Sequence, residues 1–340
     1  MGSSSSRDSP PIIARCSSPT YCVRVVGSRH ILLGGGGGAS KTGVPNNIQT
    51  LLLSFDSKSL AVAAEDLLKA SEQLPLVMEV TNELKTDPYA TMNMDCVLVG
   101  ASEQGKYLLA AGHDEKLSRI TSDEKSSNAY QVKKTVRFGR NVEGQSQRLY
   151  TGGADGFIRI WDVEMIRQGS TSKHTPLIKI KAHQGDVNDL DISPNGKLCI
   201  SVGHDAAVHI WNTLNGEKSA VYLCRKKLVM SLGTVYGSWF QKHNIFGYLQ
   251  SNSTYKKAVS HVALWAFNHD RNVCRPIIVR EACKETISAL AVSDCGNFFA
   301  LGTMDGGVGI YDTHELRSLY FVQKHMPSSL QEWHPNIEQP

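Results

Sequence analysis

A short phrase ending in aspartate recurs along the chain and constrains its fold more than any other feature. In three copies an aromatic residue follows six positions after the aspartate, and Trp265 marks a further unit that lacks the aspartate. The copies end at Asp114, Asp155, Asp205 and Asp305, and the aromatic residues are Trp161, Trp211 and Tyr311. The units lie about 40 to 55 residues apart, which is the period of propeller blades that end in a Trp-Asp signature.

The unit from Lys181 to Asn212 shows what one repeat contains. Residues 187–192 alternate between apolar and polar types, a Ser-Pro-Asn-Gly turn follows, and two further apolar runs cover 198–201 and 208–211. Such runs between turn residues are typical of strands. Helical periodicity is nearly absent, and 61–71 is the one short helix expected. The sequence therefore predicts an all-β WD-repeat β-propeller of about seven blades, six of them recognisable and the last one incomplete.

The clearest unit also contains a serine, a histidine and an aspartate, which are the residue types of a nucleophilic triad. They are His183, Ser201 and Asp205, and Trp211 completes the set. Similar residues recur in several units, and repeats share packing rather than a catalytic site. We therefore expect a structural hydrogen-bond network that holds strands together.

A run of five glycines, Gly34 to Gly38, is the second strong signal. The phosphate-loop fingerprint nearly fits from Gly35 to Thr42, but Ser40 replaces its second glycine. Turn residues and the strand-like run 48–55 follow, whereas a phosphate loop must open a helix. Nucleotide binding is therefore the minor alternative. A loop over 34–47, between two strands and pressed against a partner, is the better interpretation.

Composition excludes several classes of protein. The net charge of +4 is too small to indicate nucleic acid, and eight cysteines without a C-x-x-C pair indicate free thiols rather than a zinc site or disulfides. No apolar stretch reaches the length of a membrane span. We expect a disordered leader over 1–18, the propeller over 19–325, and a disordered, divergent tail over 326–340.

A propeller whose first blade carries a glycine-rich Lys-Thr-Gly loop resembles one family. It is the endoplasmic-reticulum exchange-factor family for the Sar-type GTPase of the COPII coat, whose animal member is also called prolactin regulatory element-binding protein. The resemblance covers most of 21–324. Its motifs are Gly34–Gly37, Lys41–Val44, Asn46, Ala90–Asn93, Thr151–Trp161, Lys181–His183, Leu301–Thr303, Gly309–Tyr311 and Leu319–Val322.

The resemblance implies a guanine-nucleotide exchange factor without covalent chemistry. It would promote GDP release from a Sar-type small GTPase and so start COPII vesicle formation in transport from the endoplasmic reticulum to the Golgi. The residues that would act on the GTPase switch regions are Lys41, Thr42, Gly43, Val44 and Asn46. Asn93 would support the loop.

The resemblance also implies a structural potassium ion and no organic cofactor. The backbone of Gly35, Gly36, Gly37 and Gly38 would hold the ion, because carbonyl oxygens are hard ligands. The family resides on the cytosolic face of the endoplasmic-reticulum membrane. For this chain, which shows no anchor, a cytosolic location is the physical default.

Two other functions remain open at the level of sequence. The first is a WD-repeat scaffold without catalytic effect. The second is promoter binding, which the family's alternative name suggests. Scattered basic pairs are its only support, and no known DNA-reading motif accompanies them. These short basic runs are Lys133-Lys134, Arg225-Lys226-Lys227 and Lys256-Lys257.

Overall fold

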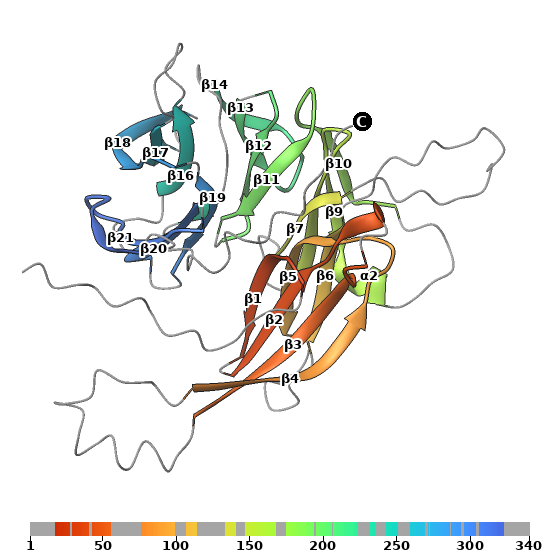
Figure 1. Cartoon of the computed structure of the whole chain (residues 1–340). Helices are drawn as coiled ribbons and strands as arrows, with labels where there is room; N and C mark the ends of the chain where they lie inside the picture. Colours follow the sequence, from red (N-terminus) through yellow and green to blue (C-terminus); the bar gives the residue numbers. More distant parts are fainter. Residues whose placement is uncertain are drawn as a thin grey trace, which may run out of the picture. The chain divides into compact units, whose positions relative to one another are not determined.

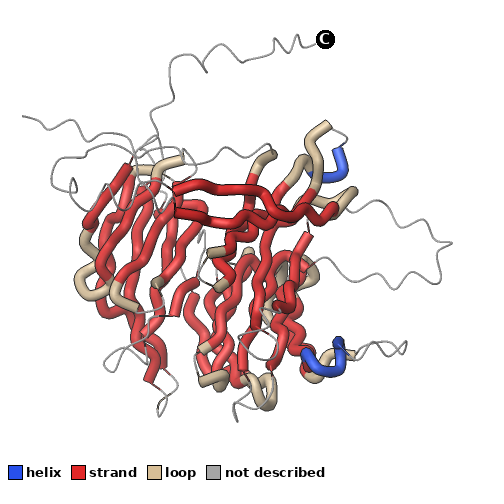
Figure 2. Tube along the Cα trace, turned by 90° about the horizontal axis from the view of Figure 1, so that it is seen from below, coloured by secondary structure: helices blue, strands red, loops and turns tan. Residues whose placement is uncertain are grey.

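The structure is a computed structural model, and most of the described chain is strand, as Figure 2 shows. It divides into two compact units, residues 1–222 and 223–340. The described residues are 18–27, 29–40, 43–55, 76–98, 107–113, 133–140, 147–167, 175–193, 195–205, 207–223, 232–234, 243–250, 259–268, 271, 273–285, 287–293, 296–303 and 306–322. The leader before residue 18, the tail 326–340 and the expected helix 61–71 lie outside them.

The first unit begins with the sheet that carries the glycine loop (Figure 1). Its strands pair in chain order, each antiparallel to the next. They are β1 (Thr20–Val26), β2 (His30–Gly35), β3 (Asn47–Phe55) and β4 (Leu76–Lys85). The 3-10 turn η1 (Gly38–Ser40) lies between β2 and β3. Two described strands follow as a separate antiparallel pair, β5 (Thr91–Leu98) and β6 (Tyr107–His113).

Two further four-stranded sheets complete the first unit. One contains β7 (Lys133–Arg140), β8 (Gln147–Gly153), β9 (Phe157–Asp162) and β10 (Ile178–Lys181). The short helix α2 (Val163–Arg167) follows β9. The other contains β11 (Val187–Ile192), β12 (Leu198–Gly203), β13 (Ala207–Asn212) and β14 (Lys218–Leu223), and thus reproduces the strands expected for that repeat.

The second unit holds two four-stranded antiparallel sheets. The first contains β15 (Leu232–Thr234), β16 (His243–Gln250), β17 (Val259–Asn268) and β18 (Val273–Cys283). The second contains β19 (Ile287–Val292), β20 (Phe298–Thr303), β21 (Val308–Asp312) and β22 (Ser318–Val322). The last described sheet therefore has four strands, and the incomplete last blade that the sequence predicts after these sheets lies outside the described residues.

The core of each unit lies between neighbouring sheets. In the first unit Tyr150 and Ile160 of one sheet pack with Leu190 of the next. In the second unit Leu264 packs with Phe299 and its neighbours. The four repeat aromatics are buried as predicted, and two of them, Trp211 and Tyr311, belong to these cores: Trp161, Trp211, Trp265 and Tyr311.

The first strands of five sheets share one irregularity near their start. Each shifts register by one residue against the second strand of its sheet, which is the sign of a β-bulge. The shifts lie at Thr20/Cys22, Thr91/Asn93, Lys133/Thr135, Val187/Asp189 and Ile287/Ala289. The bulge therefore provides a common reference point for comparing positions between sheets.

Candidate functional site

The glycine loop connects β2 to β3 and is closed by their pairing. Gly35 lies opposite Asn47 in the antiparallel register, so residues 36–46 form the loop proper. A single 3-10 turn occupies Gly38–Ser40. Lys41 and Thr42, both expected to act on the GTPase, lie outside the described residues.

Three glycines at the base of the loop lie where a side chain would collide. A Cβ on Gly34 would come 2.7 Å from Cys22 Sγ and 2.8 Å from Thr91 Cγ2. A Cβ on Gly35 would overlap the Pro19 carbonyl oxygen. A Cβ on Gly36, where φ is +134°, would overlap the Asn46 side chain. Glycine is therefore required at these three positions by close packing and not by a need for flexibility.

Two other glycines are required by backbone conformation alone. Gly38 has φ +72° and Gly43 has φ +77°, and a Cβ on either would meet no atom within 4 Å. Residues with a Cβ rarely adopt this left-handed region. Glycine thus serves two distinct purposes within one loop.

Asn46 is buried within the loop and holds it together through hydrogen bonds. Its side chain is buried, with 4% of the residue exposed. The Gly38 N–H donates to its Oδ1 at 2.8 Å, and its Nδ2 donates to the Gly38 carbonyl at 3.2 Å and to Asp87 Oδ1 at 3.0 Å. The Thr86 N–H donates to the backbone oxygen of Asn46 at 2.9 Å. Asn46 therefore holds the loop in shape, and its amide faces the chain's own groups.

The start of β1 and the start of β5 form the floor of the loop. The Gly36 N–H donates to the Pro19 carbonyl at 3.0 Å. The Cys22 thiol lies 3.6 Å from the carbonyl oxygens of both Gly34 and Thr91. Burial raises the pKa of Cys22 to about 11, so the group remains a neutral thiol that donates to these oxygens.

These internal bonds argue against a phosphate site. A phosphate loop needs backbone N–H groups directed at the ligand and an α-helix behind them. The N–H groups of Gly36 and Gly38 are bonded to Pro19 and Asn46, and a three-residue 3-10 turn replaces the helix.

The loop does offer oxygen atoms of the kind that bind hard cations. The Gly38 carbonyl and the Asp87 carboxylate both accept from Asn46 Nδ2, so the two oxygens lie near each other. The described residues contain no group of three His, Cys, Asp or Glu side chains placed to hold a metal. Backbone oxygens at Gly35–Gly38 stay the ligands that the sequence predicts for a cation here.

The outer part of the loop carries Val44. Its side chain is half-buried, between the exposed residues Gly43 and Pro45. Sequence reasoning missed Pro19, Cys22 and the Thr86–Asp87 turn as parts of this site. No local signal marks them, because they lie far from the loop along the chain.

The four residues expected to be structural form one hydrogen-bonded series away from the loop. His183 Nδ1 lies 2.9 Å from Asp205 Oδ1, and its Nε2 lies 2.8 Å from Ser201 Oγ. Trp211 Nε1 donates to the same hydroxyl at 2.9 Å. Ser201 is fully buried, so its hydroxyl is not available to a substrate. Burial also lowers the pKa of His183, which keeps the imidazole neutral.

Comparison with known proteins first establishes the class. The family model described as WD domain, G-beta repeat matches residues 142–162 and 174–212, on the β7–β10 and β11–β14 sheets. A chain from a crystal structure of the mitotic checkpoint complex superposes with a TM-score of 0.56 at 12% identity, covering 89% of this chain and 77% of that one. The chain is an all-β WD-repeat β-propeller.

Relatives in sequence then point to one kind of propeller. The guanine nucleotide-exchange factor SEC12 of Mus musculus is 25% identical over 353 residues, covering 91% of this chain and 79% of the relative. SEC12 of Rattus norvegicus matches to the same extent. A p21-activated protein kinase-interacting protein 1-like protein of Danio rerio is 37% identical, but over 22% of this chain. The resemblance to the exchange-factor family is thus confirmed over most of the chain.

Among the residues that the structure describes, no helix is long and apolar enough to cross a bilayer.

Proposed function

We propose that this chain is a guanine-nucleotide exchange factor for a Sar-type small GTPase, and that the glycine loop is the element that acts. The observation that carries the proposal is a loop fixed by its own packing and hydrogen bonds, on a propeller similar to SEC12 over 91% of its length. A loop of this kind can keep its shape against the force of a bound partner. We further propose that the chain works at the endoplasmic reticulum, at the start of COPII vesicle formation.

Exchange requires differential binding. The factor must hold the nucleotide-free GTPase more tightly than the GDP-bound form, since only that difference shifts the equilibrium. In this proposal Val44 supplies an apolar contact to the switch regions, Lys41 faces acidic groups of the GTPase, and Thr42 and Gly43 shape the segment between them. Asn46 acts from beneath as a positioning residue, through its bonds to Gly38 and Asp87.

Potassium fits this proposal as a structural ion. The backbone oxygens of Gly35, Gly36, Gly37 and Gly38 would hold it, and the Asp87 carboxylate lies near the Gly38 oxygen. When bound, the ion would balance the partial negative charges of the oxygen atoms around it and make the loop more rigid. No chemical step depends on it, because exchange breaks no covalent bond.

The test measures GDP release from a purified Sar-type GTPase by fluorescence of a labelled nucleotide, with and without the chain. We expect Val44→Asp to reduce the rate at least tenfold, because a charge would be desolvated in the contact without a partner. Val221→Asp, at a half-exposed valine on β14, is the matched control and should leave the rate unchanged. Binding of the GTPase without faster GDP release would refute the proposal and favour the scaffold alternative.

A further inference from the structure

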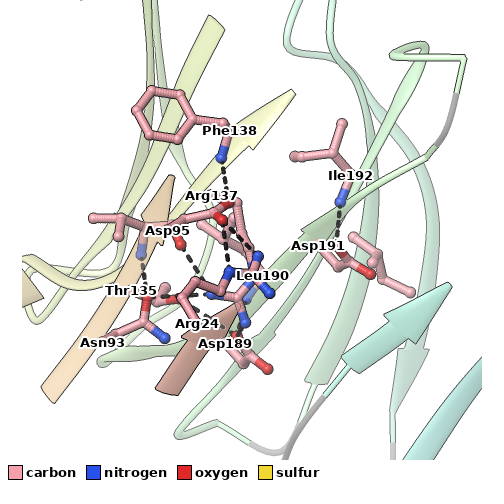
Figure 3. Close-up of polar contacts among 12 residues, drawn as sticks. Arg24, Asn93, Asp95, Thr135, Arg137, Phe138, Asp189, Leu190, Asp191 and Ile192 are labelled. Carbon is pink, nitrogen blue, oxygen red and sulfur yellow. Dashed lines mark hydrogen bonds and ion pairs between the residues drawn. The ribbon is translucent and has the colours of Figure 1, made fainter. Parts of the chain in front are cut away.

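A series of polar contacts joins the first strands of four consecutive sheets, as Figure 3 shows. It runs from Arg24 on β1 to Asp95 on β5, then to β7 around Arg137, and on to Asp189 on β11. Each link crosses from one sheet to the next. The sheet that carries the glycine loop lies at one end of this series.

Asp95 joins three strands with one carboxylate. Its Oδ1 accepts from Arg24 Nε at 2.8 Å, from Arg24 Nη2 at 2.5 Å and from the Cys96 N–H at 2.9 Å. Its Oδ2 accepts from the Phe138 N–H on β7 at 2.7 Å. The side chain is 7% exposed, whereas Arg24 is 41% exposed. Asp95 is therefore the fixed partner, and Arg24 reaches it from the loop-bearing sheet.

The β-bulge shows that the charges follow a pattern. Counting from the register shift in each first strand, Arg24, Asp95, Arg137 and Asp191 occupy the same position on β1, β5, β7 and β11. The sign of the charge alternates from each sheet to the next. Asp191 is thus the counterpart of Asp95 three sheets from the loop, and its Oδ1 accepts the next N–H at 2.9 Å in the same way.

The Arg24–Asp95 pair and the loop are connected through β1 and β5. β1 begins next to Pro19, which accepts the Gly36 N–H, and β5 begins at Thr91, against which Gly34 packs. The turn before β5 contains Asp87, which holds Asn46. Both the floor and the fastening of the loop thus depend on how β1 lies against β5.

Resting on the proposed function, we propose that Asp95 is a positioning residue for the exchange reaction, which holds β1 against β5 through Arg24 and so sets the place of the glycine loop. It contacts neither the GTPase nor the nucleotide. Asn93, expected beneath the loop, bonds instead to the Val136 N–H and Arg137 on β7, so it fixes β5 from the other side. The series as a whole gives β5 a defined position.

The test compares Asp95→Asn with the matched control Asp191→Asn. The first readout is hydrogen exchange of the Gly36 and Gly38 amides, which are bonded to Pro19 and Asn46. We expect Asp95→Asn to speed it roughly threefold to tenfold, the range typical of residues that act through others. Asp191→Asn should leave it unchanged. Arg24→Gln changes a partly exposed partner and should give the same result if Asp95→Asn does not fold.

The second readout is GDP release. A displaced loop weakens the nucleotide-free complex more than the first encounter, so kcat should fall roughly threefold to tenfold while KM stays within about twofold. Equal effects of Asp95→Asn and Asp191→Asn on the loop amides, or no effect of either, would overturn the inference. Faster amide exchange in Asp95→Asn together with a wild-type chain that releases no GDP would support the positioning role and refute the exchange function.

Discussion

Replacing one glycine of the loop by alanine provides the sharpest test of how the loop is held. Gly36 and Gly38 are two residues apart, and both have positive φ. A methyl group on Gly38 would enter open space, whereas a methyl group on Gly36 would overlap Asn46 Oδ1 and lie 2.8 Å from its Cα. Gly38→Ala therefore measures the cost of backbone conformation alone, and Gly36→Ala adds the cost of displacing Asn46.

The two costs can be worked out separately. For Gly38→Ala the left-handed conformation costs about 1 kcal/mol. For Gly36→Ala the backbone cost is of the same order, and moving Asn46 breaks its bonds to the Gly38 N–H, the Gly38 carbonyl and Asp87. At about 1 kcal/mol net for each bond, the total is roughly 4 kcal/mol. The free energy of unfolding of the loop should differ between the variants by about 3 kcal/mol.

Hydrogen exchange of the Gly38 amide measures this free energy locally, because that amide is bonded to Asn46. Urea unfolding followed by tryptophan fluorescence reports whether the propeller itself remains folded. We expect Gly36→Ala to leave the propeller folded, to abolish protection of the Gly38 amide and to lose GDP release, while Gly38→Ala retains most of both. Equal losses of Gly38 amide protection and GDP release in the two variants would refute this prediction, because the overlap with Asn46 would then add nothing to the cost of the backbone conformation.

Three further outcomes are expected. Replacing potassium by choline at constant ionic strength should slow GDP release, because the loop oxygens would lose their counter-ion; an unchanged rate would remove the ion from the proposal. Ser201→Ala should lower the free energy of unfolding by about 2 kcal/mol, since His183 and Trp211 would each lose a buried partner, and urea titration would detect this. Burial is the main cause that lowers the pKa of His209 to about 4, and the nearby charge of Lys218 acts in the same direction. The native state therefore favours neutral His209, so the free energy of unfolding should be fully present above about pH 6.5 and should decline as the pH falls towards 4. His209→Gln should make this decline smaller, and urea unfolding midpoints measured from pH 7 to pH 4 would show it.

The repeats could be predicted from sequence because each is a local pattern. The turn at 193–196 and the strands on either side of it are specified within about 30 residues, and Trp211 follows at a fixed distance. The burial of the repeat aromatics follows from the same periodicity. The bond from Trp211 to the Ser201 hydroxyl has a counterpart in the preceding unit, where Trp161 donates to the Thr151 hydroxyl.

The interior of the loop could not be predicted in the same way. Asn46 bonds to Gly38 and to Asp87, which is 41 positions away, while its contact with the GTPase stays a prediction. Asp95 and Arg24 are 71 positions apart. A single sequence gives no indication of such pairs, because they depend on how one sheet packs on the next. The close packing of Gly34 and Gly35 depends in the same way on residues outside the run, namely Pro19, Cys22 and Thr91.

The glycine tract has a consequence for changes in its length. If the loop behaved as a flexible polymer, a sixth glycine between Gly34 and Gly38 would change the free energy of folding very little, because the entropy lost on closing a loop grows only with the logarithm of its length. Here neighbouring glycines face different atoms: a thiol and a threonine methyl, then a carbonyl oxygen, then a carboxamide. An inserted glycine would leave the tract made of glycine alone, but it would shift Gly38 by one residue relative to its hydrogen-bond partner Asn46. A tract that looks repetitive in the sequence therefore has a fixed count, and its length should tolerate change less than its appearance suggests.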